Sequence, residues 1–274
     1  MKCRICPHHC DLSPGQTGRC GARKNTGDRI VGLNYGRVTS IALDPIEKKP
    51  LMRFHPGEFI LSVGGFGCNL KCPFCQNHEI SMAGEDFPTR LLSPEQLAGA
   101  ALDLAQEPRG NLGVAFTYNE PFISYEYVTD TAKLLKRAGL HTVLVTNGMV
   151  EEEPLRELLP RISAMNIDLK GFRQDFYTWV GGSLETVLRT IRISAEAVHV
   201  EVTTLIVPGE NDSLEDMEAE AAWLAKLSPE LPLHISRFFP RYLVQDRPPT
   251  SVERIYQLCE AAKKHLKYVY AGNC

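Results

Sequence analysis

Cys68-Asn69-Leu70-Lys71-Cys72-Pro73-Phe74-Cys75 is the stretch that decides how this chain folds and what it binds. Its three cysteines have C-x3-C-x2-C spacing, and an aromatic residue directly precedes the last of them. Four thiolates close a structural zinc site or fully ligate a [4Fe-4S] cluster, so three thiolates indicate a cluster with one iron open to an outside ligand. A zinc knuckle completed by His78 is the alternative.

The sequence around this stretch predicts a parallel α/β fold. A short apolar segment and a glycine-rich turn precede Cys68, and from residue 59 onward apolar strand-like segments alternate with amphipathic helical ones. Six such repeats are too few for a closed eight-stranded barrel, so we expect a partial (β/α)6 barrel. The expected strands are 59–63, 113–117, 141–146, 162–169, 199–207 and 233–236, and the expected helices are 93–106, 123–138, 151–159, 183–195, 213–225 and 252–266.

Residues 1–58 have a different composition, rich in Gly, Pro and Cys, with only short strand-like pieces at 29–35 and 37–43. Four of their residues, Cys3, Cys6, Cys10 and Cys20, can close a site around zinc or around a second [4Fe-4S] cluster. A segment of this size has little apolar core, so a metal would stabilise it, and an auxiliary cluster that relays electrons is the functional alternative. We therefore expect a cysteine-rich segment at 1–58 and a barrel at 59–274.

Length, charge and cysteine usage limit the functional classes. The 274 residues suffice for one barrel-sized domain with a small appendage, and the net charge of -3, with both signs interspersed, does not favour nucleic acid or an acidic membrane as partner. No stretch reaches the roughly 18 apolar residues of a membrane span. Seven of nine cysteines lie in two clusters with metal-ligand spacing, which fits a reducing, cytoplasmic compartment better than disulfides do.

The ends of the expected strands carry polar residues, and in parallel α/β folds the chemistry collects at those ends. The second strand ends in Asn119-Glu120-Pro121, the third in Thr146-Asn147-Gly148, and the fourth carries Asp168 and Lys170 on one side. Each pattern also has a structural interpretation. Asn119 can cap a helix, Asn147-Gly148 can form a turn, and the two charges can form an ion pair.

The last two strands add weaker candidates. Thr203 lies on the same face of the fifth strand as Glu201 and can line a binding site. His234 and Arg237, near the end of the sixth strand, can grip a polar substrate, although a histidine in an apolar strand is more often a hydrogen-bonded core residue. The segment 237–242, Arg-Phe-Phe-Pro-Arg-Tyr, suits closing over the barrel mouth with its cations toward an anionic group, and it equally suits a packed loop end.

The C-x3-C-x-aromatic-C pattern after a strand and a glycine-rich turn resembles the signature of radical S-adenosylmethionine (radical SAM) enzymes. The resemblance implies that Cys68, Cys72 and Cys75 hold three irons of a [4Fe-4S] cluster and that SAM chelates the fourth. One electron then splits SAM into methionine and a 5'-deoxyadenosyl radical, and the electron donor is a flavodoxin or a ferredoxin.

The same resemblance implies a set of SAM-binding residues. Glu120 is expected to bind the methionyl ammonium, in a segment where Tyr118 and Asn119 replace the usual paired glycines. Lys170 is expected at the SAM carboxylate or ribose, positioned by Asp168. The remaining members of the set are Phe74, Asn119, Thr146, Asn147 and Thr203. Thr146-Asn147-Gly148 resembles a segment of glycyl radical activating enzymes, but Val145 stands where those enzymes commonly carry an aspartate associated with a monovalent cation.

The spacing from Cys3 to Cys20, C-x2-C-P-H-x-C-x-L-x-P-G-Q-x-G-x-C, resembles the opening of AmmeMemoRadiSam system radical SAM proteins, which are related to pyruvate formate-lyase activating enzymes. This resemblance covers nearly the whole chain. The leading hypothesis is an enzyme that cleaves SAM reductively and takes hydrogen from an unidentified small molecule, with an anionic group favoured. The alternatives are an activating enzyme that installs a glycyl radical on a partner protein, and a non-catalytic iron-sulfur or zinc module.

Overall fold

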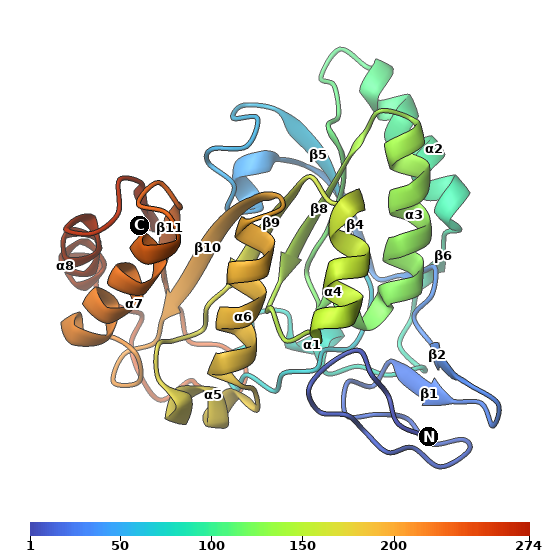
Figure 1. Ribbon diagram of the computed structural model, residues 1–274, viewed down its shortest axis with the longest axis horizontal. Helices are drawn as coiled ribbons and strands as arrows, with labels where there is room; N and C mark the ends of the chain where they lie inside the picture. The colour runs from blue at the N-terminus through green and yellow to red at the C-terminus, as the bar shows by residue number, and fades with distance from the viewer.

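An eight-stranded sheet rolled into an open barrel forms the centre of the computed structural model, which describes all 274 residues (Figure 1). Its order is β12-β11-β10-β9-β8-β7-β5-β4; β4 is antiparallel to β5, and all other neighbours are parallel. The partial barrel expected from the sequence is therefore confirmed. The strands are β4 (Ser40–Pro45), β5 (Phe59–Gly64), β7 (Gly113–Phe116), β8 (His141–Thr146), β9 (Ala164–Asp168), β10 (His199–Ile206), β11 (Leu233–Arg237) and β12 (Val269–Gly272).

Helices cover the outer face of this sheet, as the alternating pattern predicted (Figure 1). Serine side chains cap the N-termini of four of them, and at α2 Ser93 and Gln96 form a reciprocal capping box. The helices are α1 (His78–Ser81), α2 (Pro94–Gln106), α3 (Tyr125–Arg137), α4 (Glu152–Leu158), α5 (Gln174–Val180), α6 (Leu184–Ala195), α7 (Leu214–Leu227) and α8 (Val252–Lys263), with short 3-10 turns at Ile46–Lys48, Pro121–Ser124 and Leu159–Arg161.

Two strands of the sheet were not among the six expected ones. β12 is short and only partly buried, so its sequence lacks the continuous apolar run of a central strand. β4 lies at the opposite edge and exposes Ile41, and it pairs with β5 along its whole length. Because β4 precedes residue 58, the sheet includes part of the expected N-terminal segment. The division of the chain into 1–58 and 59–274 stays a prediction.

The segment that connects β4 to β5 fills the N-terminal end of the barrel. Ile46, Leu51 and Phe54 pack against inward-facing side chains of four strands. The backbone of this segment is bound as well: the Asn166 side chain donates to the Pro50 carbonyl at 2.8 Å, and the amides of Met52 and Arg53 donate to the Glu201 carboxylate at 3.0 and 2.7 Å. One end of the barrel is thus closed by core packing, and only the C-terminal end of the strands remains available for a ligand.

The first residues form a small unit beside the barrel, with a hairpin of β1 (Arg23–Asn25) and β2 (Ile30–Gly32) (Figure 1). The buried Arg23 joins this unit to α3 through two hydrogen bonds to Glu126, at 2.5 and 2.8 Å. A second pair, β3 (Arg37–Val38) with β6 (Arg90–Leu91), lies beyond it in the chain.

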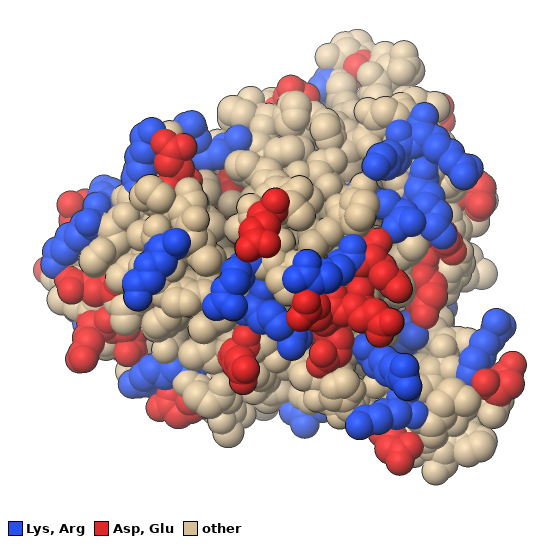
Figure 2. All heavy atoms as spheres, in the orientation of Figure 1, with Lys and Arg blue, Asp and Glu red and all other residues tan.

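The outer surface carries both signs of charge. On the face shown in Figure 2, acidic side chains gather near α4 and basic ones border them, so no broad field of one sign forms there. None of the helices combines the length and the apolar character that a membrane crossing requires.

Candidate active site

The three cysteines of the quoted stretch lie together at the C-terminal end of the barrel. Cys68, Cys72 and Cys75 follow β5 and line a cavity of about 290 Å³. The loop is fixed by its backbone: the Cys68 amide donates to the Cys20 carbonyl at 3.1 Å, and the Lys71 amide donates to the Val180 carbonyl at 2.8 Å. Burial raises the pKa of the Cys72 thiol to about 12, and it also raises that of Cys68. Buried thiols of this kind are ionised only when a metal binds them, so the donor set fits a metal cluster.

The turn before Cys68 requires a glycine at position 67. Its φ is +86°, a left-handed conformation that favours glycine, and a Cβ there would lie 2.5 Å from the Cys20 carbonyl oxygen. Phe74, on the other side of the loop, is buried against Phe176 and Trp179. Gly67 on one side of the loop and the Phe74 ring on the other therefore set the position of the three thiols.

Glu120 supplies a buried carboxylate to the same cavity. It follows β7, is 2% exposed, and accepts hydrogen bonds from the Phe122 amide at 2.9 Å, the Thr146 hydroxyl at 2.8 Å and the Asn147 amide at 2.8 Å. Burial raises the pKa of Glu120 to about 7, although these three donors act in the opposite direction. All its protein partners are neutral, so a cationic ligand is the group that would stabilise the carboxylate.

The side chains of Asn119 and Thr146 form hydrogen bonds to other protein groups of the site. The Asn119 side chain accepts from the Gly65 amide at 2.9 Å and donates to the Gly67 carbonyl at 3.1 Å, so it holds the glycine-rich turn. Thr146 does not line the cavity; its hydroxyl is used by Glu120. Asn147 does line it, and its side-chain amide donates to Asn69 at 2.9 Å and lies 3.5 Å from the Cys68 sulfur.

Asp168 and Lys170 meet in an ion pair of 2.7 Å across the cavity from Glu120. Burial tends to lower the pKa of Lys170, but the attraction of Asp168 and the nearby thiols outweighs it, and the pKa is raised. Thr203 lines the cavity beside them, and its hydroxyl accepts from Asn166 at 2.8 Å. The lysine is thus a permanent cation at one side of the cavity, opposite a carboxylate.

His234 and Arg237, predicted to grip a substrate, do not line this cavity. His234 is buried lower in the barrel, where it contacts Glu201 at 2.6 Å, and Glu201 also contacts His199 at 2.9 Å. Arg237 donates to the Thr250 carbonyl and lies over the Phe239 ring. Both side chains already have partners inside the protein: His234 lies two residues deeper than Ser236 on the inward face of β11, and Arg237, on the alternate face, is bound by the following loop.

Several cavity residues escaped the sequence analysis. Ser236 lies two residues after His234 on β11, so the two-residue period of the strand could have placed it in the mouth. Tyr118 has a φ of +69° and its hydroxyl donates to Asp44 at 3.0 Å, while the Asn77 side chain donates to its carbonyl at 2.8 Å. Nothing in the local sequence indicates these contacts, nor that Asn273 also reaches the cavity.

The four cysteines near the N-terminus gather around a second, small and enclosed cavity. Cys3, Cys6, Cys10, Cys20 and His8 all line it, and no disulfide joins the thiols. Burial raises the pKa of the Cys6 thiol to about 12. No three His, Cys, Asp or Glu side chains of the molecule stand in the arrangement of a single-ion site, and this applies equally to Cys68, Cys72 and Cys75. The two sets differ in number and burial: three of the four N-terminal thiols are buried, against one of the three that follow β5.

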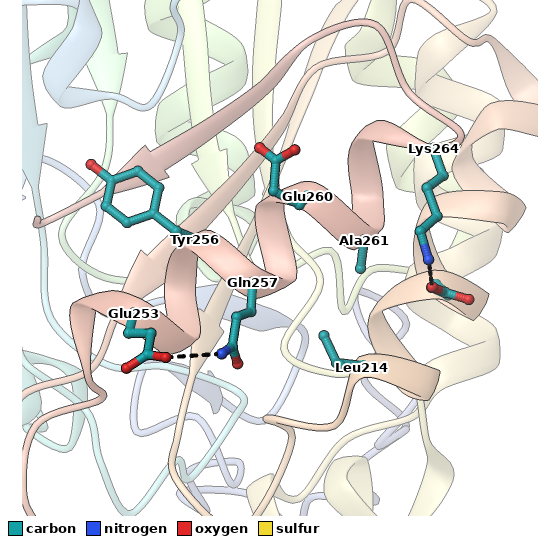
Figure 3. Close-up of a pocket in the computed structure, with 8 residues that line it drawn as sticks. Leu214, Glu253, Tyr256, Gln257, Glu260, Ala261 and Lys264 are labelled. Atoms are coloured by element: carbon teal, nitrogen blue, oxygen red, sulfur yellow. Dashed lines mark hydrogen bonds and ion pairs between the residues drawn. The ribbon is translucent and has the colours of Figure 1, made fainter.

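A further hollow lies on the outer surface between α7 and α8 (Figure 3). Its polar side chains are paired with one another, Lys264 with Glu218 and Gln257 with Glu253. It contains none of the predicted site residues, so the cavity at the strand ends is the candidate active site.

Comparison with known proteins identifies the fold and the cysteine loop together. Residues 62–224 match the family model of the radical SAM superfamily. The chain belongs to the radical SAM superfamily. Membership implies a [4Fe-4S] cluster and SAM as cofactors, and the match contains all three cysteines as well as Glu120 and Lys170.

Radical SAM relatives of this chain include proteins of known and unknown activity. An uncharacterised protein of Methanocaldococcus jannaschii is 40% identical over 279 residues, covering 100% of this chain and 81% of the relative. A pyruvate formate-lyase-activating enzyme of Clostridium pasteurianum is 28% identical over 155 residues, covering 55% of this chain and 63% of that enzyme. The narrower AmmeMemoRadiSam assignment stays a prediction.

Solved radical SAM structures agree with the fold. A radical SAM methyltransferase from Sphaerobacter thermophilus superimposes with a TM-score of 0.58 at 19% identity, covering 80% of this chain and 67% of that structure. A domain of a pyruvate-formate lyase-activating enzyme from Bacteroides vulgatus gives a TM-score of 0.51 at 23% identity, covering 58% of this chain and 98% of that structure. The likeness is one of architecture.

Proposed function

We propose that the protein is a radical SAM enzyme that cleaves S-adenosylmethionine reductively and takes a hydrogen atom from a substrate. The observation that carries this proposal is the convergence of Cys68, Cys72, Cys75, Glu120 and the Asp168–Lys170 pair on one cavity. Bound there, a [4Fe-4S] cluster supplies the electron that breaks the C5'–S bond of SAM, which leaves methionine and a 5'-deoxyadenosyl radical.

Side chains of opposite charge would bind different groups of SAM. The Glu120 carboxylate would accept from the methionyl ammonium, and Lys170 would attract the methionyl carboxylate or donate to the ribose. Asp168 holds the lysine in place at 2.7 Å. Thr146, Asn147 and Asn119 orient Glu120 and the glycine turn, and Thr203 borders the same cavity. The electron would come from a reduced flavodoxin or ferredoxin.

The substrate is proposed to be a small molecule with an anionic group. The 237–242 segment lies against the cysteine loop: the Leu243 amide donates to the Pro73 carbonyl at 2.9 Å, and the Tyr242 ring stacks on His78 at 4.5 Å. Arg241 is exposed on this segment, whereas Arg237 is bound internally. A segment held at the mouth suits closure over a small substrate and exclusion of water.

A glycyl radical activating enzyme is the second candidate, favoured by the pyruvate formate-lyase-activating relatives. The two candidates differ in where the hydrogen comes from. Incubation with SAM, reductant and a deuterated metabolite extract should put deuterium into 5'-deoxyadenosine. A stable glycyl radical signal on a partner protein, seen by electron paramagnetic resonance, would favour the activating enzyme.

The test of the proposal is SAM cleavage by the anaerobically reconstituted protein. Dithionite and SAM should yield 5'-deoxyadenosine, and Cys68→Ala, Cys72→Ala or Cys75→Ala should abolish it, because each removes a ligand of the cluster. Cys259→Ala is the matched control, since Cys259 is buried in α8, away from the cavity. Continued cleavage by a variant lacking all three cysteines would overturn the proposal.

The N-terminal cysteines are proposed to hold a metal of their own. Three of the four are buried, and all four line one cavity, which brings together the number of thiolates that closes a zinc or [4Fe-4S] site. Metal analysis separates the two forms: about four irons with one zinc indicate a structural ion, and about eight irons indicate a second cluster. A Cys6→Ala/Cys10→Ala variant should lose this metal, and unchanged metal content would contradict the site.

A further inference from the structure

Asn69 lies between the two cysteine sets and contacts both. It directly follows Cys68, is fully buried, and carries hydrogen bonds on its backbone and on its side chain. A buried amide with this many partners has a single allowed orientation, because any rotation would leave a polar atom unpaired. Asn69 therefore transmits a displacement on one side to the groups on its other side.

On the N-terminal side, Asn69 is held by the cysteine-rich loop. Nε2 of His8 lies 2.8 Å from the Asn69 carbonyl oxygen, and because a carbonyl only accepts, Nε2 carries the proton. The Cys68 amide donates to the Cys20 carbonyl at 3.1 Å, so the two loops share backbone hydrogen bonds next to both sets of thiols.

On the other side, Asn69 holds part of the SAM cavity. The Asn147 side chain donates to Asn69 Oδ1 at 2.9 Å and approaches the Cys68 sulfur at 3.5 Å. The backbone amide of Asn147 donates to Glu120 at 2.8 Å. The side chain of Asn69 donates in turn to the Met149 carbonyl at 2.7 Å, which fixes the loop after β8. A series of hydrogen bonds thus runs from His8 through Asn69 and Asn147 to Glu120, the carboxylate assigned to SAM.

We propose that metal bound by Cys3, Cys6, Cys10 and Cys20 strengthens SAM binding through Asn69, which acts as a positioning residue between the two sites. This inference rests on the proposed function of both cysteine sets. Without metal the short N-terminal loop has little apolar packing of its own to hold His8 in place. With metal the loop is fixed, Asn69 and Asn147 keep their orientation, and Glu120 is ready for the ammonium of SAM.

Coupling of this kind is reciprocal. If N-terminal metal tightens SAM binding by a given factor, SAM tightens the hold on that metal by the same factor. The structure thereby assigns to the N-terminal site a regulatory influence on radical formation, in addition to any stabilising one.

The experiment is a calorimetric measurement of SAM affinity on the anaerobically reconstituted full chain. Cys10→Ser removes the least buried of the four N-terminal ligands and leaves the radical cluster ligands in place. It should raise the Kd for SAM by about 5- to 100-fold, the usual range for coupled sites. In an Asn69→Ala background, which itself binds SAM less tightly, the same Cys10→Ser change should have almost no further effect.

His8→Ala and His9→Ala form a second, matched pair that leaves all four thiols in place. His8→Ala removes the hydrogen bond to Asn69 and should weaken SAM binding. His9→Ala, one residue further, removes a contact with Glu151 at 3.2 Å and should leave SAM affinity unchanged. This pair gives the answer if Cys10→Ser disturbs folding, which circular dichroism would reveal.

The outcomes separate the inference from the proposal beneath it. Wild-type SAM affinity in Cys10→Ser and His8→Ala would overturn the coupling while leaving the proposed function intact. An equally large effect of Cys10→Ser in the Asn69→Ala background would overturn the role of Asn69. Failure of the wild-type protein to bind SAM at all would overturn the proposed function, and the coupling with it.

Discussion

Two buried carboxylates in the same barrel, Glu120 and Glu201, differ in their hydrogen-bond partners and in the direction in which their pKa values are shifted. Glu120, at the open end, accepts from neutral donors, and its pKa is raised to about 7 by burial. Glu201 lies near the filled end. Burial tends to raise its pKa as well, but hydrogen bonds from His199 and His234 outweigh this effect and lower the pKa to about 2. The comparison teaches that Glu201 has enough donors inside the protein to stay ionised, whereas Glu120 has only neutral donors and would gain from a cationic ligand.

The largest expected effect is on stability, at the filled end. Glu201→Gln should lower the free energy of unfolding at pH 7 by about 3 kcal/mol, because the carboxylate accepts from Met52, Arg53 and two histidines, and an amide in its place leaves buried donors without an acceptor. The loss should shrink in acid. Since the folded pKa of about 2 lies below the usual value of 4.5, the stability from Glu201 is complete above pH 4.5 and disappears as the pH falls toward 2.

Chemical denaturation followed by circular dichroism measures this change. Glu218→Gln is the control, because Glu218 forms an exposed ion pair with Lys264 and should leave stability almost unchanged. Equal stability of Glu201→Gln and wild type at pH 7 would show that the histidines do not stabilise this carboxylate.

The next largest effect is on the affinity for SAM, which is proposed to bind at the open end. Glu120→Gln should weaken SAM binding about 10- to 100-fold, the loss of one charge-assisted hydrogen bond, while the absorbance of the iron-sulfur cluster is retained. Calorimetry with SAM measures it. Glu220→Gln is matched to it, since Glu220 is a buried carboxylate on α7 whose pKa is also raised by burial, to about 8, and it lies outside the cavity. Unchanged affinity in Glu120→Gln would make Glu120 a helix-start residue only.

A smaller effect concerns pH. Below pH 7 the Glu120 carboxyl must lose its proton before it can pair with an ammonium, so SAM affinity should rise by up to about tenfold per pH unit and level off above 7. The dependence should be absent in Glu120→Gln, measured by the same calorimetry. A slope that is identical in both proteins would assign it to another group.

The smallest expected effect separates the two histidines at the filled end. The His199 side chain is 30% exposed and that of His234 is 7% exposed, so water can replace the first hydrogen bond to Glu201 but not the second. His199→Gln should cost about 1 kcal/mol and His234→Gln more, by chemical denaturation. The reverse order would show that burial does not control the strength of these bonds.

The sequence predicted the open end better than the filled one. Cys68, Glu120 and Lys170 belong to local motifs whose chemistry can be read from residue type and spacing. Glu201 was noted on the same strand face as Thr203, but its partners Met52 and Arg53 lie about 150 residues away along the chain, and no local pattern links them. The sequence left His234 between a substrate role and a hydrogen-bonded core position, and the structure places it in the core beside Glu201.

Six of the helices and the central strands were predicted because each carries its own periodicity. β4 was expected only as a strand-like piece at 37–43, outside the sheet, and the short helices α1 and α5, the edge strand β12 and Asn69 were not predicted. β4 and β12 are half exposed and lack an apolar run, while Asn69 is an ordinary polar residue until the N-terminal loop and the loop after β8 are folded against it. Its role comes from tertiary contacts alone.

The sheet begins at β4 and ends at β12, and these two strands do not pair with each other. A barrel that is open along a seam between two edge strands can widen by a small rotation between neighbouring strands, and no hydrogen bond between strands has to break. A closed barrel cannot widen in this way. The outward-facing amides of both edge strands should exchange with deuterium faster than those of β8 and β9. The seam is therefore the place where the width of the barrel can change at the smallest cost in hydrogen bonds.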